Sequence, residues 1–344
     1  MVVAQALGEL PTARMTAIFP MGCRIGAEVE VQVHGADLDG AAALRFSDPG
    51  ISAQVTDAGE RKFKVRVAGD VPAGVYEVRF AGALGLTNPR PFVVSSLAEV
   101  RSPAGNTTRE TAAALGDNSV INGIAVSRQS VWFKVTAIKG QRLLLRVSSA
   151  ALDSRLNPVV LLRDSAGERL ARGNDDGLID YTAATDGDCL IQIHDAIYGG
   201  GNEYFFRLEN SSGPYVDFVS PLIVSSFTGS EVTLYGRNLP GSKPSGLKSV
   251  HGLSLEQLTV KFSDLIHGDR PGGVLLPPAA VTLDGRVFRL AKGKFTSNPF
   301  FVGLCEGKSL TMEQGDNETA DHAQIIHAPG LVAGCFFPAR DVDC

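Results

Sequence analysis

An acidic turn is the densest group of potential metal ligands in the sequence. Asn174-Asp175-Asp176-Gly177 is followed by Asp180, and carboxylate and amide oxygens are the ligands that calcium prefers. The spacing lacks the alternating acids of an EF-hand loop and its terminal glutamate. Two interpretations stay open, a calcium loop of low affinity and a solvated turn of the kind that Asn, Asp and Gly favour.

The pair His194-Asp195 could supply two members of a hydrolytic triad. A triad also needs a positioned nucleophile, and the chain has no G-x-S-x-G or comparable signature. We therefore predict a non-enzymatic protein in which His194 bonds backbone at a strand end. His322 and His327 are not spaced i, i+4 and have no H-E-x-x-H context, which argues against zinc.

A glycine-rich turn, Tyr198-Gly199-Gly200-Gly201-Asn202-Glu203-Tyr204, separates two expected strands. No helix with a Lys-Ser/Thr ending follows, so the turn is not a phosphate loop. It is either a flexible hairpin tip or a ligand-contact loop, with Tyr198 stacking on a sugar and Asn202 beside it. Trp132 lies next to Phe133 in an expected strand and is predicted to pack in the core or against the sheet; sugar binding is the alternative.

Composition places these residues in a folded all-β protein. The chain has 344 residues, enough for two to four domains, with 44% hydrophobic and 20% charged residues. Its 38 Gly and 18 Pro suit many short strands joined by turns. The net charge of −5 argues mildly against nucleic-acid binding. No apolar run approaches the roughly 18 residues of a membrane span.

Cysteine usage and the N-terminus indicate little about compartment. The five cysteines are Cys23, Cys189, Cys305, Cys335 and Cys344, with no C-x-x-C pair for zinc or redox chemistry. Cys189, in an expected strand, is predicted to be a small buried hydrophobe. A disulfide between Cys305 and Cys335 is possible, and the residues do not decide whether it forms. Ala4-x-Ala6 has the form of a signal-peptidase site; the segment is either a signal-peptide remnant or an ordinary disordered N-terminus.

Strands and turns alternate along almost the whole chain. Glu28–His34 places Val on one face and polar groups on the other, and Phe63–Val67 and Val75–Phe80 do the same. Such strands bury one face against a second sheet. The one modest helical prediction is Glu110–Leu115. The fold class is therefore all-β, with tandem β-sandwiches.

The sequence also repeats itself. Glu30–Leu38 matches Glu231–Leu239, and Thr87–Val93 matches Ser297–Val302. The match continues from Asn106-Thr107-Thr108 to Asn317-Glu318-Thr319, and from 121–124 to 332–335. The second copy stops where the first has Trp132. About 40 residues with one or two strands cannot bury a core, so we expect a fragment or a truncated product of a longer array.

The repeat divides the chain into five parts. We expect an N-terminal stub over 1–14, an immunoglobulin-like sandwich over 15–96 and a second sandwich over 97–213. A third sandwich over 214–303 and an incomplete copy of the second over 304–344 follow.

The second part resembles a bacterial pre-peptidase C-terminal domain. The carrying residues are Asn106-Thr107-Thr108, Ile121-Asn122-Gly123, Trp132-Phe133, Leu161–Gly167, Asn174-Asp175-Asp176 and Gly187–Ile193. The parts on either side resemble immunoglobulin-like or TIG-like domains. The arrangement is similar to large secreted bacterial proteins, which implies a jelly-roll-like sandwich, export to the cell envelope or beyond, and a role in targeting or binding.

The resemblance also implies calcium in some relatives, held by a Glu/Asn/Asp cluster at the domain start and an Asp pair before the Trp. The first copy departs from this pattern, because only Asn106 and the loop residues Asp175 and Asp176 survive. The incomplete copy keeps more of the ligand types: Glu313, Asp316, Asn317, Asp341 and Asp343. Calcium needs six to eight oxygens, so we predict a cofactor-free first copy, with calcium reserved for the second.

Three functions follow as hypotheses. The first is adhesion or substrate targeting through a polysaccharide or an extracellular protein. The second is a purely structural stalk, and the third is the accessory region of a secreted hydrolase. Ligand identity and oligomeric state are left open by the residues.

Overall fold

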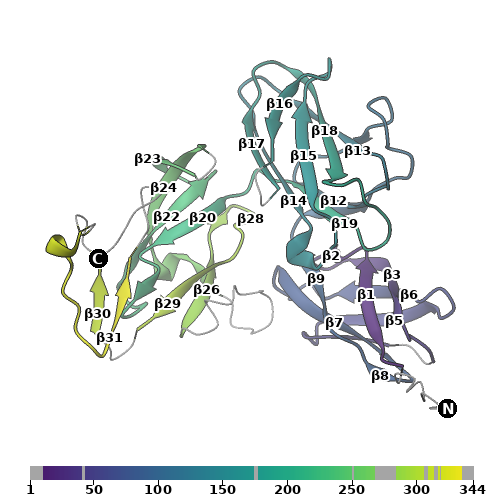
Figure 1. Ribbon diagram of the computed structural model, residues 1–344, viewed down its shortest axis with the longest axis horizontal. Coiled ribbons are helices and arrows are strands. Elements are labelled where there is room, and N and C mark those ends of the chain that lie inside the picture. Colours follow the sequence, from purple (N-terminus) through teal and green to yellow (C-terminus); the bar gives the residue numbers. More distant parts are fainter. Residues whose placement is uncertain are drawn as a thin grey trace, which may run out of the picture. The chain divides into compact units, whose positions relative to one another are not determined.

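The computed structural model describes residues 11–40, 43–173, 177–249, 252–267, 284–305, 309–313, 317 and 319–334. The protein is all-β (Figure 1), and its helical residues form short 3-10 turns. Within the described residues no helix is long and apolar enough to cross a membrane. The chain divides into two compact units, Met1–Ser211 and Ser212–Cys344.

The first sandwich of unit 1 is immunoglobulin-like and packs two antiparallel sheets face to face. One sheet has the order β1 (Arg14–Phe19), β3 (Glu28–Ala36), β6 (Lys62–Val67), β5 (Ile51–Asp57). The other has the order β2 (Gly22–Arg24), β9 (Arg90–Ser95), β7 (Gly74–Gly82), β4 (Ala43–Phe46), with β8 (Gly85–Leu86) paired to β7. Val31, Val33, Val65 and Val67 are buried between them, as the alternating pattern predicts.

The second sandwich of unit 1 is jelly-roll-like and also has two sheets. One has the order β10 (Ala98–Arg101), β12 (Ser119–Ile124), β19 (Phe205–Asn210), β14 (Arg142–Ser148), β17 (Leu178–Thr182). The other has the order β11 (Ala113–Ala114), β13 (Val131–Ala137), β18 (Gly187–Asp195), β15 (Pro158–Arg163), β16 (Arg169–Arg172).

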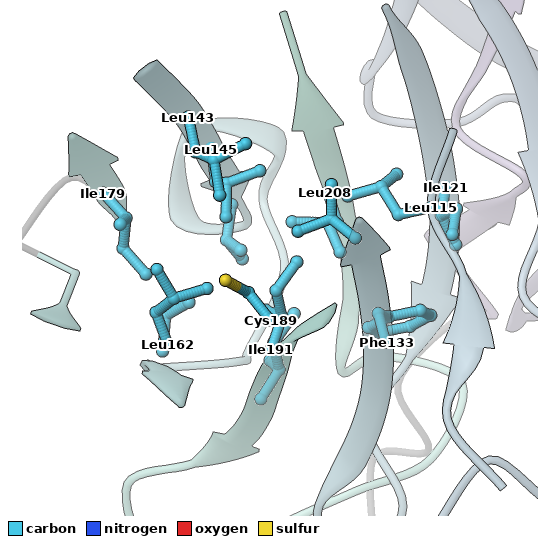
Figure 2. Close-up of a cluster of buried hydrophobic side chains, with 14 of the residues drawn as sticks. Leu115, Ile121, Phe133, Leu143, Leu145, Leu162, Ile179, Cys189, Ile191 and Leu208 are labelled. Carbon is cyan, nitrogen blue, oxygen red and sulfur yellow. The ribbon is translucent and has the colours of Figure 1, made fainter. Parts of the chain in front are cut away.

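Burial in the second sandwich confirms two predictions. Figure 2 shows the Cys189 sulfur among Leu and Ile side chains of both sheets, so Cys189 is a small buried hydrophobe. Burial raises the pKa of its thiol, and nearby Asp188 and Asp164 raise it further. Trp132 is buried, with the Arg109 guanidinium 5.6 Å above its ring, so its role is packing.

The expected helix at Glu110–Leu115 is wrong. Ala113 and Ala114 form strand β11, which pairs in parallel with Phe133 and Lys134 of β13. The Leu115 amide also donates to the Lys134 carbonyl, and the Leu115 side chain enters the core. Sheet hydrogen bonds and core burial outweigh the local helix propensity of three alanines.

The third sandwich, in unit 2, repeats the arrangement of the first. Its sheets have the orders β20 (Tyr215–Ser220), β22 (Glu231–Arg237), β24 (Ser254–Lys261), β23 (Lys243–Lys248), and β21 (Ile223–Val224), β29 (Phe300–Leu304), β26 (Gly285–Arg289), β25 (Ile266–His267). β27 (Ala291–Lys292) and β28 (Phe295–Thr296) form a hairpin. The sandwiches differ in one edge: β4 precedes the β5–β6 hairpin, whereas β25 follows the β23–β24 hairpin.

An asparagine clamp is common to the first and third sandwiches. Asn88 accepts from the Met15 amide and donates to the Met15 carbonyl, both at 3.0 Å. Asn298 makes the same two bonds to Val216, both at 2.8 Å. Each clamped residue adjoins a bulge in the first strand of its sandwich. The backbone amide and carbonyl that a bulge leaves without a strand partner are thereby satisfied.

We expect Asn88→Ala and Asn298→Ala each to lower the stability of its own unit by about 1–3 kcal/mol. Asn298→Ala removes the asparagine from the Val216 amide and carbonyl. Asn88→Ala removes it from the Met15 amide, whereas the Met15 carbonyl still accepts from Arg90 Nε at 2.9 Å, so its effect should be the smaller one. Hydrogen exchange of the intact chain measures this by unit. Asn88→Ala should raise exchange in β1 and β3 and leave β20 and β22 unchanged; Asn298→Ala should do the opposite. Equal effects of either variant on both units would contradict separate clamps.

A final two-stranded ladder reproduces the start of the second sandwich. β30 (Ser309–Met312) pairs in parallel with β31 (Gly330–Ala333), from Ser309↔Gly330 to Met312↔Ala333. In the first copy β10 pairs in parallel with β12, from Ala98↔Ser119 to Arg101↔Asn122. The two ladders have the same length, direction and register, and one constant offset relates all their residues.

Candidate functional site

The glycine-rich loop between β18 and β19 is held by a single carboxylate. Asp195, which is buried at the end of β18, accepts from the amides of Asn157 at 2.9 Å, Ile197 at 3.1 Å and Gly199 at 2.9 Å. Burial alone would raise the pKa of Asp195, but these backbone N–H groups hold it below its ordinary value. The carboxylate is therefore ionised and orders the loop at neutral pH.

The same loop is also bonded to the segment that joins β12 to β13. The Arg128 amide donates to the Tyr198 carbonyl at 2.9 Å, and the Gly201 amide donates to the Ala125 carbonyl at 3.0 Å. A Cβ on Gly200 would lie 2.1 Å from the Ser127 nitrogen, so only glycine allows this approach. These bonds hold the loop in one conformation, which argues against the prediction of a flexible hairpin tip.

Tyr198 lies at the exposed end of the loop. Its backbone is left-handed, with φ of 58°. Its ring stacks on the His194 ring, with the ring centroids 4.4 Å apart and the ring planes 2° from parallel. The side chain is still 45% exposed, and the neighbouring Ile197 is exposed as well. An aromatic ring that is fixed on one side and open to solvent is suited to stacking on a flat apolar surface.

His194 and Asp195 do not form a catalytic dyad. His194 Nδ1 lies 2.8 Å from the Asp195 carbonyl oxygen, which makes Nδ1 the donor. The Asp195 carboxylate is occupied by backbone amides and does not orient the imidazole. The backbone-bonding role predicted for His194 matches this geometry.

Asn202, the other predicted contact residue, points to the first sandwich. Its Nδ2 lies 3.4 Å from His34 Nδ1 on β3. Burial, with the Arg61 and Arg101 charges, lowers the pKa of His34, so a neutral imidazole is available to accept this bond. Asn202 and Tyr198 thus belong to one loop but face different surroundings.

A buried ion pair of the second sandwich lies where that sandwich meets the first one, and no sequence motif predicts it. Arg207 on β19 binds Glu99 on β10 through two hydrogen bonds of 2.7 Å, and both side chains are 6% exposed. Asn122 and Ser95 donate to the Glu99 oxygens at 3.0 and 2.8 Å. We name these four residues the clasp. The sequence signal was a charged residue, Arg207, between the apolar residues Phe206 and Leu208.

The clasp reaches the first sandwich through a glycine. A Cβ on Gly22 of β2 would lie 2.0 Å from Arg207 Nη1 and 2.6 Å from the Val93 carbonyl oxygen. Gly22 therefore makes room for the guanidinium. Beside it, five buried apolar side chains from both sandwiches form one cluster: Ala17, Phe19, Met21, Leu152 and Phe205.

Charge and hydrogen bonding keep the clasp ionised. Burial alone would raise the pKa of Glu99, but the Arg207 guanidinium and the bonds from Asn122 and Ser95 hold that pKa below its ordinary value. A groove of about 280 Å³ lies alongside, lined by both sandwiches, with Arg24, Glu28, Glu30 and Arg101 among its residues.

Two residues considered as calcium ligands in the first copy have hydrogen-bond partners within the protein. Asn106 is buried, and its Nδ2 donates to the Trp132 carbonyl at 3.0 Å. Asp180 makes two 2.7 Å bonds to Arg142. Asp175 and Asp176 lie outside the described residues. The Asp180 carboxylate thus pairs with Arg142 on the neighbouring strand β14. The Asn106 side chain bonds the backbone of β13 through its nitrogen, and this bond does not use the oxygen that would bind calcium.

The structure describes two of the predicted calcium ligands of the incomplete copy, Glu313 and Asn317. Asn317 is buried, as its counterpart Asn106 is, and the Glu313 carboxylate lies where a Cβ on Gly334 would meet it at 2.4 Å. Asp316, Asp341 and Asp343 lie outside the described residues. Across the described part of the chain, no three His, Cys, Asp or Glu side chains gather as a metal site. Calcium in this copy stays a prediction.

No family model matches the chain, and no curated protein matches it. Among solved structures it is similar to the pre-peptidase C-terminal domain of Bacillus anthracis collagenase, with 14% identity, 29% of this chain and 93% of that chain covered, and a TM-score of 0.25. It is also similar to SGBP-B of the Bacteroides ovatus mixed-linkage glucan utilization locus in complex with a mixed-linkage heptasaccharide. The identity is 12%, the match covers 87% of this chain and 47% of that chain, and the TM-score is 0.22. A third similar structure is that of domains 5–6 of the S-layer protein SbsC. The identity is 13%, the match covers 73% of this chain and 98% of that chain, and the TM-score is 0.21. At these values the likenesses do not identify a family.

Proposed function

We propose that this chain is a non-catalytic binding protein of the cell envelope or the extracellular space, and that it binds a polysaccharide through the loop 196–204. The observation that carries the proposal is the Tyr198 ring, which is held on one face by His194 and is 45% exposed. Sugar rings present flat apolar C–H faces, and an aromatic side chain gains contact area on them at low entropic cost.

The order of the loop supports the same proposal. Asp195 fixes the Ile197 and Gly199 amides, and the Arg128 amide fixes the Tyr198 carbonyl. A ligand that meets an ordered loop does not have to compensate the entropy of ordering it. Loops on a rigid sandwich are a common place for such sites.

A second function, a structural spacer, is favoured by the clasp. Ser95 of the first sandwich donates a hydrogen bond to Glu99 of the buried Glu99–Arg207 pair in the second sandwich, and an apolar cluster with side chains from both sandwiches lies beside it. A linker that only tethered two binding domains would need neither. On this hypothesis unit 1 is a rigid element that sets the distance between other parts of an assembly.

Binding of insoluble and soluble polysaccharides by the intact chain tests the first function. We expect Tyr198→Ala to weaken binding roughly tenfold or more, because a stacked ring contributes about 1–3 kcal/mol. A panel of glycans, mixed-linkage glucan included, measured by pull-down and calorimetry gives the result. Leu86→Ala is the matched control, because Leu86 is an exposed apolar residue of β8 in the same unit.

Two outcomes would count against glycan binding. Equal loss with Tyr198→Ala and Leu86→Ala would show nonspecific adsorption. Binding to no glycan by the wild-type chain would leave the spacer function as the better account of unit 1.

A further inference from the structure

Arginine side chains gather on the outer face of one sheet of the second sandwich. In the hairpin formed by β15 and β16, Arg163 lies directly opposite Arg169. Leu162 lies opposite Ala171, and both pack in the core. Because side chains alternate between the two faces of a sheet, Arg163, Arg169 and Arg172 share the outer face. Like charges opposite each other on paired strands are destabilising, so this arrangement is not explained by stability.

A fourth arginine reaches the turn of the same hairpin from the loop that follows β10. Arg109 Nη1 donates to the Ala166 carbonyl at 3.4 Å, and Arg163 Nη1 donates to the Gly167 carbonyl at 2.8 Å. A Cβ on Gly167, whose φ is 94°, would lie 2.0 Å from Arg109 Nη1, so glycine makes room for this guanidinium. We name four residues the arginine cluster: Arg109, Arg163, Arg169 and Arg172.

The arginine cluster has no carboxylate partner in the part of the chain that the structure describes. None of its four members forms an ion pair there. Asp164 and Glu168 belong to the same turn, where the Asp164 carboxylate accepts from the Glu168 amide at 2.8 Å. Lys134 and Asp188, on the same face of the sheet, pair with each other at 3.2 Å. The cluster is therefore a local concentration of positive charge in a chain whose net charge is −5.

The guanidinium of Arg163 is oriented before any ligand arrives. Its Nε donates to Gln192 Oε1 at 2.9 Å, and Gln192 Nε2 in turn donates to the Ser130 hydroxyl at 2.9 Å. A guanidinium has five N–H donors, so others remain for an anion after these internal bonds. Planar guanidinium groups bind carboxylates through pairs of parallel hydrogen bonds. A group that is already held costs less entropy when it binds.

The arginine cluster lies on the same sheet face as the Tyr198 platform. His194, on which Tyr198 stacks, is opposite Val159 of β15. Val159, Leu161 and Arg163 then follow one another on the outer face of that strand, and the first two are half-buried. Four residues of a strand extend over roughly 13 Å. A partly apolar path of this length thus joins the aromatic ring to the positive charges.

We propose that the polysaccharide bound at Tyr198 is an acidic one, and that its carboxylate groups bind the arginine cluster. This inference rests on the proposed function, because Tyr198 holds one part of the sugar chain. An apolar sugar face stacks on the ring, the chain follows Val159 and Leu161, and a uronate carboxylate farther along the chain meets the guanidinium groups. The cluster thereby selects charged over neutral polysaccharides.

Polygalacturonate and its methyl-esterified form test the proposal, because they share one backbone and differ in the charge of their carboxyl groups. We expect the intact chain to bind polygalacturonate roughly tenfold or more tightly than the ester, since hydrogen bonds to charged groups are the stronger ones. Calorimetry at low and high salt measures this. The difference between the two polymers should shrink at high salt, because salt screens exposed charges.

The double variant Arg169→Gln/Arg172→Gln removes two exposed charges of the cluster. Its affinity for polygalacturonate should fall to that for the ester, and its affinity for the ester should equal that of the wild-type chain. The urea midpoint reported by Trp132 should not fall, because the change relieves like-charge repulsion. Arg45→Gln/Arg66→Gln is the matched control. It removes the same charge from exposed positions of the first sandwich and should leave both affinities unchanged.

Several results would overturn the proposal and leave glycan binding at Tyr198 standing. They are equal affinity of the wild-type chain for the two polymers, with both lost in Tyr198→Ala, and equal losses in the two double variants. Single-stranded DNA bound as tightly as polygalacturonate, with no effect of Tyr198→Ala, would also overturn it, because the surface would then bind any polyanion. Binding of no glycan at all would instead remove the proposed function, and this inference with it.

Discussion

Replacing Arg207 with methionine should destabilise unit 1 by about 3–5 kcal/mol, because Glu99 is left as a buried charge without its partner. Both side chains are 6% exposed, so water does not replace the guanidinium. Trp132 is the one tryptophan of the chain and lies in unit 1, so its fluorescence in urea reports this unit. The urea concentration at the midpoint of unfolding should fall markedly in the Arg207→Met variant.

Two further variants show whether the loss comes from the unpaired charge. Glu99→Leu/Arg207→Met should recover most of the stability, because apolar side chains often replace a buried ion pair at little cost. Arg155→Gln removes an ion pair with Glu203 whose side chains are 66% and 36% exposed; it should cost less than about 1 kcal/mol. A double variant as unstable as Arg207→Met would contradict this explanation.

The pH dependence has a definite sign. The pKa of Glu99 is lowered in the folded state from 4.5, so the clasp contributes fully above that value and its contribution is lost as pH falls through the lowered pKa. The wild-type chain should therefore lose stability in acid through this residue. Arg207→Met should not show that loss, because a buried carboxyl without a cation is more easily protonated.

The sequence predicts the scaffold well because its signals are local. Alternation in Glu28–His34 requires one buried face, and the structure buries it. The repeat from Asn106 to Asn317 survives as one constant offset in the β10–β12 and β30–β31 ladders. Both signals rest on which residues are apolar and how they are spaced, and burial depends on little else.

The clasp could not be predicted in the same way, because it depends on contacts across the chain. Glu99 and Arg207 are 108 positions apart, and Gly22 belongs to another sandwich. The helix expected at Glu110–Leu115 failed for a related reason: local propensity is weak against pairing with β13. Tyr198 could be proposed from the sequence because a glycine-rich turn with an aromatic residue is a local signal, whereas the contact of Asn202 with His34 is a long-range one.

Replacing Asp195 with alanine should have the second large effect, and it connects stability to binding. The carboxylate accepts from the amides of Asn157, Ile197 and Gly199, and alanine leaves these donors without it. We expect the free energy of unfolding of unit 1, measured by Trp132 fluorescence in urea, to fall by about 3 kcal/mol.

The proposed glycan binding should fall with the Asp195→Ala change as far as it does in Tyr198→Ala, although Asp195 itself is buried, because the carboxylate positions the loop that carries Tyr198. Asp186→Ala is the matched control. Its carboxylate accepts one exposed backbone bond, from Lys139 at 2.7 Å, so its loss should cost less than about 1.5 kcal/mol and leave binding unchanged. If Asp195→Ala is destabilised but binds glycan as the wild-type chain does, the loop is a structural element and Tyr198 is not the platform. If it is as stable as Asp186→Ala, the three bonds do not hold the loop.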